Sequence, residues 1–178
     1  MLFGTNALND RVRQTLVASL YTHPSSLAIG AFCGVGTSFA DALISDTPAI
    51  TQATLLLAVI AVLRVSAAVY LLRRADQHGT RQLELLYETG AWSYAFVLGL
   101  IAALTISYRV DPQVQTLMIA NAIGFGVGTA ARNAGRPVIA IGQLVFALLP
   151  PIGAMIYEGS VAHIVLAISM VVLIPAMI

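Results

Sequence analysis

The sequence predicts an all-α protein, a polytopic membrane bundle of six transmembrane helices, and three observations predict it. Of its 178 residues, 58% are hydrophobic and only 10% are charged, whereas about a quarter of an average soluble domain is charged. Six apolar runs approach the ~20 residues that cross a bilayer as a helix. The breaks between them contain proline, glycine and charge, which end helices. The composition excludes a soluble globular domain and a disordered chain.

The six predicted spans follow one another closely. They are Ser25–Ile44, Ile50–Leu72, Gly90–Tyr108, Val114–Ala131, Pro137–Tyr157 and Val161–Met177. Continuous runs favour helices over the ~10-residue alternating segments of a transmembrane barrel. Because most connections are short, consecutive helices are expected to lie antiparallel as neighbours. The spans form one predicted domain, residues 25–178.

A separate segment, residues 1–24, precedes the first span. Leu8, Val12, Leu16 and Leu20 recur every four residues, and polar side chains fill the other face. This spacing predicts an amphipathic helix lying in the membrane interface. A helix docked on the bundle is the open alternative.

The arginines predict the orientation of the bundle. With a cytoplasmic N-terminus, seven of the nine lie in cytoplasmic segments, Arg109 lies outside and Arg64 lies within the second span. Positive residues stay on the cytoplasmic side. We therefore expect the N-terminus and the C-terminus to be cytoplasmic, and the protein to be a multi-pass protein of a bacterial inner membrane.

Several classes of chemistry are not indicated. The single cysteine, Cys33, excludes an intrachain disulfide, and a net charge of +1 argues against nucleic-acid binding. No catalytic motif is present, so no catalytic residue is expected. No metal-ligand spacing or cofactor motif appears, and neither a metal nor a cofactor is expected.

Arg64 is the clearest candidate for a functional charge, because ionisable groups inside a bilayer are costly. We expect it to face the bundle and to meet a carboxylate or carbonyl groups. Glu88 is the nearest carboxylate in depth, and Glu84 lies one turn earlier. The functional interpretation is a charged switch between helices. The alternative is a structural ion pair or a snorkelling arginine.

A second polar group is predicted at the same depth. The turn after the fourth span contains Arg132, Asn133 and Arg136, and Gln143 lies two turns into the fifth span. Together with Glu88 they are expected to form a hydrogen-bonded layer that couples the bundle to a cytoplasmic domain. The alternative is a loop that only sets topology.

The opposite half of the bundle contains candidate ligand-binding residues, namely Asp41, Asn121, Tyr157 and His163. A histidine with a carboxylate can bind a metal or sense protons. The alternative is that each side chain is simply hydrogen-bonded.

Glycines predict close helix contacts. Gly30 and Gly34 are four residues apart in the first span, as are Gly124 and Gly128 in the fourth. Small residues let helix backbones approach closely in lipid. Contact within one bundle and contact between protomers both remain open.

Two stretches carry a resemblance to a known family. They are Glu84-Leu85-Leu86-Tyr87-Glu88-Thr89-Gly90-Ala91 and Arg132-Asn133-Ala134-Gly135-Arg136-Pro137, followed by Gln143 and Pro150. They resemble the N-terminal integral-membrane sensor region of bacterial cyclic-di-GMP signalling proteins. The resemblance runs from about Leu16 to the end of the sequence. It implies a dimerising sensor followed by a cytoplasmic GGDEF diguanylate cyclase, in some proteins with an EAL phosphodiesterase domain.

The functional expectation is therefore a membrane sensory module. It would respond to a small ligand or a lipid signal, form a homodimer and control an output domain in the same polypeptide. That domain is expected after Ile178, because the sequence stops at the tail of a hydrophobic span. The chain itself is not expected to be an enzyme. The alternative function is a small transporter or channel that uses Arg64 and Asp41.

Overall fold

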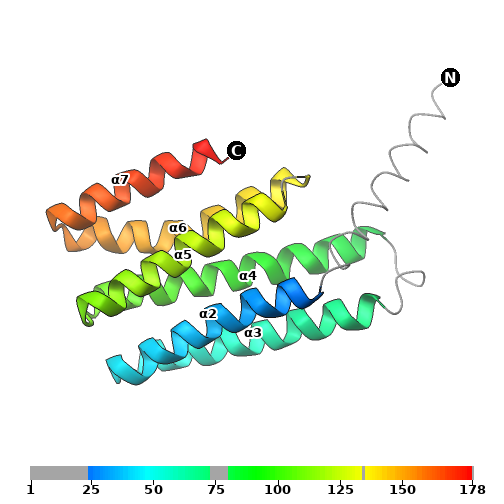
Figure 1. Ribbon diagram of the computed structural model, residues 1–178, viewed down its shortest axis with the longest axis horizontal. Coiled ribbons are helices and arrows are strands. Elements are labelled where there is room, and N and C mark those ends of the chain that lie inside the picture. Colours follow the sequence, from blue (N-terminus) through cyan, green and yellow to red (C-terminus); the bar gives the residue numbers. More distant parts are fainter. Residues whose placement is uncertain (1–23, 73–79, 134, 178) are drawn as a thin grey trace.

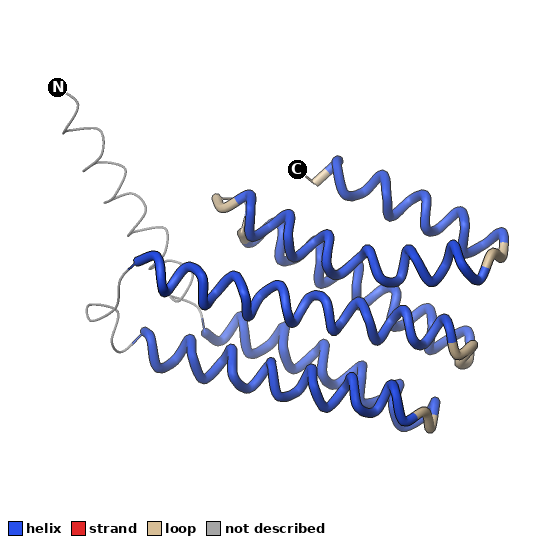
Figure 2. Tube along the Cα trace, turned by 180° about the vertical axis from the view of Figure 1, so that it is seen from behind, coloured by secondary structure: helices blue, strands red, loops and turns tan. Residues whose placement is uncertain are grey.

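The computed structural model describes residues 24–72, 80–133 and 135–177, and within these it is helical with short turns. The helices are α2 (Pro24–Ser45), α3 (Pro48–Leu72), α4 (Thr80–Ser107), α5 (Pro112–Arg132), α6 (Pro137–Glu158) and α7 (Val161–Ala176). Figures 1 and 2 show them side by side, with consecutive helices running in opposite directions. The all-α prediction is confirmed. The predicted interfacial helix, residues 1–24, lies outside the described residues except for Pro24.

Five of the described helices, α2 to α6, are long and apolar enough to cross a membrane. The protein is therefore a multi-pass membrane protein whose helices contact lipid. The predicted sixth span corresponds to α7, which has 16 residues. At 1.5 Å per residue its length is about 24 Å, less than the ~30 Å of a typical hydrocarbon core. The number of six spans and the orientation stay predictions.

The helix ends follow from local chemistry. Proline stands at the start of α2, α3, α5 and α6, where its missing N–H is not needed. The Asp111 carboxylate accepts from the N–H of Gln113 at 2.8 Å and caps α5. Gly159, at φ 78°, ends α6 in the left-handed conformation. Helix α4 begins well before the predicted Gly90, because polar residues continue it beyond the apolar run.

Helix α4 is central and packs against α3, α5 and α6, and its most extensive contact is with α6. Glycines on both helices permit this close approach. A Cβ atom on Gly99 would lie 2.5 Å from the carbonyl oxygen of Ala147, and a Cβ on Gly142 would overlap the Trp92 indole. Neither glycine belongs to the predicted four-residue pairs, so close packing here depends on isolated glycines.

Apolar side chains occupy both the inside and the outside of the bundle. Leu57 and Leu98 are fully buried in the core shared by α2 to α5. Phe32 and Val62 are 80% and 64% exposed on the outer surface. An outer surface of this kind is stable only against lipid.

The bundle has two polar ends. We call the end where α2, α4 and α6 begin the arginine-rich end, because Arg132 and Arg136 lie there. Helices α3, α5 and α7 finish at the same end, as Figure 1 shows. The turns at the opposite end contain Asp46, Arg109 and Glu158.

Candidate functional site

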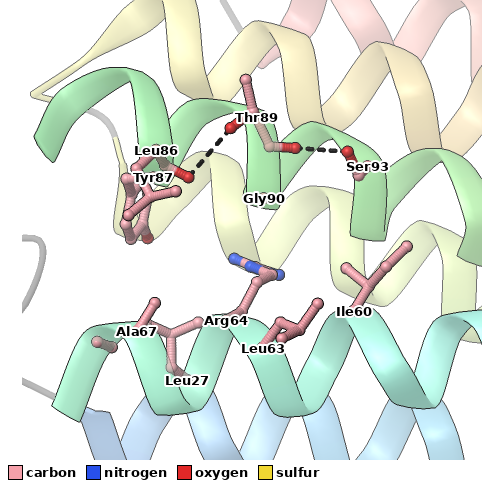
Figure 3. A pocket seen from close by; sticks show the side chains of 11 residues that line it. Leu27, Ile60, Leu63, Arg64, Ala67, Leu86, Tyr87, Thr89, Gly90 and Ser93 are labelled. Carbon is pink, nitrogen blue, oxygen red and sulfur yellow. Dashed lines mark hydrogen bonds between the residues drawn. The ribbon is translucent and has the colours of Figure 1, made fainter. Parts of the chain in front are cut away.

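Arg64 lies on α3 and points toward α4 at the arginine-rich end, as Figure 3 shows. Its guanidinium carbon is 5.1 Å from the centroid of the Tyr94 ring, a cation–π geometry. Gly90 leaves the space for this side chain, since a Cβ there would lie 3.0 Å from Cγ of Arg64. The partner of the intramembrane charge is therefore an aromatic ring.

Tyr94 connects this arginine to α2. Its side chain is fully buried, and its hydroxyl donates to the Ala31 carbonyl at 3.3 Å. A Cβ on Gly34 would overlap this hydroxyl. Gly34 is therefore required for the ring to reach α2, and the chain Arg64–Tyr94–Ala31 joins α3, α4 and α2.

Two further hydrogen bonds extend the polar contacts to α5 and α6. Arg132 Nη2 donates to the Tyr87 hydroxyl at 2.5 Å, joining α5 to α4. The Asn133 side-chain amide donates to Gln143 Oε1 at 2.6 Å, joining the end of α5 to α6. Both Asn133 and Gln143 are buried. We define the polar layer as these six side chains: Arg64, Tyr87, Tyr94, Arg132, Asn133 and Gln143.

The layer differs from the predicted one at Glu88 and in the two tyrosines that it contains. Among the described residues, Glu88 forms no hydrogen bond or ion pair, and Arg64 forms no ion pair with it. Glu88, the carboxylate nearest to Arg64 in depth, is therefore not its partner among the described residues. The Glu84 side chain lies outside the described part of the chain. Arg136 donates its backbone N–H to the Asn133 carbonyl at 2.7 Å and stands at the start of α6.

Sequence reasoning missed Tyr87 and Tyr94, which contact Arg132 and Arg64. The spacing of these tyrosines in the sequence could have indicated that they share a helix face. Tyr87, Gly90 and Tyr94 are three and then four residues apart, which puts them on one helix face. A hydroxyl-bearing ring on the same face as a glycine is well suited to an arginine that crosses from the next helix.

The four candidate ligand-binding residues in the opposite half of the bundle are not joined to one another by any hydrogen bond or ion pair in the described residues. The Thr105 hydroxyl donates to Asp41 Oδ2, and both side chains are fully buried. Asn121 donates to Thr37 Oγ1 at 2.6 Å. Tyr157 is 91% exposed. His163 Nδ1 lies 2.7 Å from Glu158 Oε2 at the turn between α6 and α7.

These positions form separate contacts, so the structure does not assemble them into one outer ligand site. Each of the three buried or partly buried side chains is held by a partner of its own. No three His, Cys, Asp or Glu side chains come together in the ranges that the structure describes.

Of the four glycines predicted to contact a neighbouring helix, one does so within this chain. Gly34 contacts Tyr94, as described above. A Cβ on Gly30, Gly124 or Gly128 would meet nothing within 4 Å. The expectation of close contact at these three positions is therefore wrong within one chain. Gly126, between the second pair, is the residue that packs on Leu144 of α6.

Two cavities flank Arg64. One, of about 270 Å³, lies between α3 and α4 and is the one shown in Figure 3. The hydroxyls of Thr89 and Ser93 line it but donate to carbonyls of their own helix, at 2.8 and 2.6 Å. The other, of about 280 Å³, lies between α2 and α5, and both Arg64 and Arg132 line it. A third cavity, of about 600 Å³, lies at the opposite end near His163.

No family model, curated protein or solved structure matches this chain.

Proposed function

We propose that this chain is a membrane sensory module that controls a C-terminal cytoplasmic output domain. The output domain is a GGDEF diguanylate cyclase, alone or followed by an EAL domain. The module spans the inner membrane six times with both ends in the cytoplasm. It works as a homodimer, and rearranged helix packing transmits the signal.

The observation that carries this proposal is the polar layer. Its contacts join α2, α3, α4, α5 and α6 at one end of the bundle. Helix α7 packs on α6 and runs toward that same end (Figure 1). Hydrogen bonds between helices have discrete alternative partners, and packed helix interfaces change between discrete arrangements. Because the contacts of the polar layer reach α2 to α6, they are suited to transmit a change in helix packing to the segment that follows α7.

The alternative function is transport, and the packed apolar core of the bundle argues against it. Leu57, Leu98, Ile101 and Met118 are all fully buried. They pack between the polar layer at one end and the Asp41–Thr105 pair toward the other. A permeation path needs polar groups or water along its length. The packed apolar core separates the polar ends instead.

The reading frame after Ile178 is the first test. We expect it to continue into a GGDEF motif, and a stop codon at that point would overturn the proposal. The second test is cyclic-di-GMP formation by the protein with its natural continuation. Absence of any nucleotide turnover by that protein would also overturn it.

The coupling role of the polar layer is tested with Tyr87→Phe, which removes the hydroxyl that accepts from Arg132 and keeps the ring. Tyr157→Phe is the matched control, because Tyr157 is almost fully exposed on α6. We expect a several-fold change in cyclic-di-GMP output only for Tyr87→Phe, with expression and dimer size unchanged. Equal output from both variants would contradict the coupling role.

A further inference from the structure

The cavity between α2 and α5 has the features of a binding site. It holds about 280 Å³ and is lined by apolar side chains, by glycines and by Arg64 and Arg132. Arg132 is exposed at the last residue of α5, and Arg64 lies deeper on α3. One guanidinium therefore stands at the mouth of the cavity and the other along its wall.

The glycines make this cavity open along its length. Gly30 on α2 and Gly124 and Gly128 on α5 all line it, and a Cβ on any of them would meet nothing within 4 Å. Ile29 beside them is 65% exposed. The cavity therefore opens on the lipid-facing surface of α2 and α5, and we call it the trough.

Both cations that line the trough lack a carboxylate partner among the described residues. Arg132 donates one N–H to Tyr87, and Arg64 lies against the Tyr94 ring. Among the described residues, no acceptor other than the Tyr87 hydroxyl is hydrogen-bonded to either guanidinium. Two cations in a medium of low dielectric constant strongly favour an anion between them.

We propose that this trough binds one anionic phospholipid, with its phosphate on Arg132 and Arg64 and an acyl chain along the glycines. Guanidinium groups match phosphate oxygens in a two-pronged geometry. Basic pockets between transmembrane helices are suited to phosphate head groups. The proposal goes beyond the sensory function, because such a lipid would link α2 to α5 whether or not an output domain follows.

The test uses the purified chain in a neutral detergent, with unfolding followed by Trp92 fluorescence. Short-chain phosphatidylglycerol, short-chain phosphatidylcholine and inorganic phosphate are each titrated. We expect phosphatidylglycerol to raise the unfolding temperature by several degrees, and the other two to have little effect. Native mass spectrometry should show one retained phosphatidylglycerol.

Two variants and their controls locate the site. Arg132→Gln removes the charge at the mouth, and Gly128→Leu fills the trough at a position where the new side chain meets no neighbour. Both should abolish the phosphatidylglycerol shift. Arg109→Gln removes an exposed charge at the opposite end, and Gly153→Leu adds the same side chain to an open position on α6. Both should keep the shift.

Three results would overturn the proposal. The first is an equal shift from phosphatidylcholine, which would indicate nonspecific lipid. The second is an equal shift from inorganic phosphate, which would indicate a soluble anion site. The third is an unchanged shift in Gly128→Leu, a variant that should fold even if Arg132→Gln does not.

Discussion

The guanidinium of Arg64 lies over the ring of Tyr94, with 5.1 Å between the guanidinium carbon and the ring centroid. The same ring carries the hydroxyl that donates to Ala31 on α2. One buried tyrosine therefore holds an intramembrane cation on one side and a helix backbone on the other. Because the two functions use different parts of the side chain, they can be separated by substitution.

Tyr94→Phe keeps the ring face and removes the hydroxyl. We expect a loss of about 1 kcal/mol of unfolding free energy, the typical value of one buried hydrogen bond. Tyr94→Leu also removes the aromatic face, and the lost cation–π contact should cost a further ~1–2 kcal/mol. Unfolding in mixed micelles with increasing SDS measures both. Equal losses in the two variants would show that Arg64 gains nothing from the ring.

Gly34 and Gly30 should respond differently to alanine although they lie four residues apart on one helix. A Cβ at Gly34 would overlap the Tyr94 hydroxyl, whereas a Cβ at Gly30 meets nothing within 4 Å. We expect Gly34→Ala to lose about 1–3 kcal/mol through overpacking. Gly30→Ala should be neutral or stabilising by up to ~1 kcal/mol through helix propensity. The same SDS titration measures the unfolding free energy of both variants. An unchanged unfolding free energy for Gly34→Ala would contradict the close approach of Tyr94 to α2.

Thr105 provides the hydroxyl that the buried Asp41 carboxylate accepts. Thr105→Val preserves shape and removes this donor, so Asp41 would keep no partner for either oxygen, since Oδ1 has none. We expect a loss of about 1–3 kcal/mol, the cost of a buried group left unsatisfied. Thr116→Val is the matched control, because the exposed Thr116 hydroxyl donates only to the Pro112 carbonyl of its own helix. Equal stability of the two variants would argue against a stabilising role for the Thr105–Asp41 contact.

The predicted orientation can be tested with single cysteines in a Cys33→Ser background. Gln113 and Gly135 are both exposed and lie at opposite ends of the bundle. We expect a membrane-impermeant maleimide to label Gln113→Cys in intact spheroplasts. Gly135→Cys should be labelled only after permeabilisation. The reverse pattern would place the N-terminus outside and would remove the predicted location of the output domain.

Much of the fold could be predicted because helix length and helix ends are local properties. The predicted fourth and fifth spans agree closely with α5 and α6, since proline begins each helix and polar turns follow. The depth of the polar residues was also predictable, because each residue advances a helix by about 1.5 Å. Arg64, Arg132, Asn133 and Gln143 do gather at one end, as their positions along the spans indicate.

The partners of these residues could not be predicted in the same way. Glu88 was expected to pair with Arg64, and Tyr94 does so instead. Gly124 and Gly128 were expected to contact a helix of the same bundle or of a second protomer; within one chain, Gly126 makes the contact instead. In each case the level along the helix was right and the rotation about its axis was wrong.

The sequence by itself determined a helical membrane protein, the order of its helices and the position of each polar group along its helix. Only the tertiary structure decided which side of each helix faces the bundle. In water an apolar stripe marks the buried face, because burial of that stripe drives packing. In lipid an apolar side chain is equally stable inside and outside, so Leu57 in the core and Val62 on the surface look alike in the sequence. Rotation is then set by close packing and by hydrogen bonds such as Arg132–Tyr87, which exist only when the helices are together.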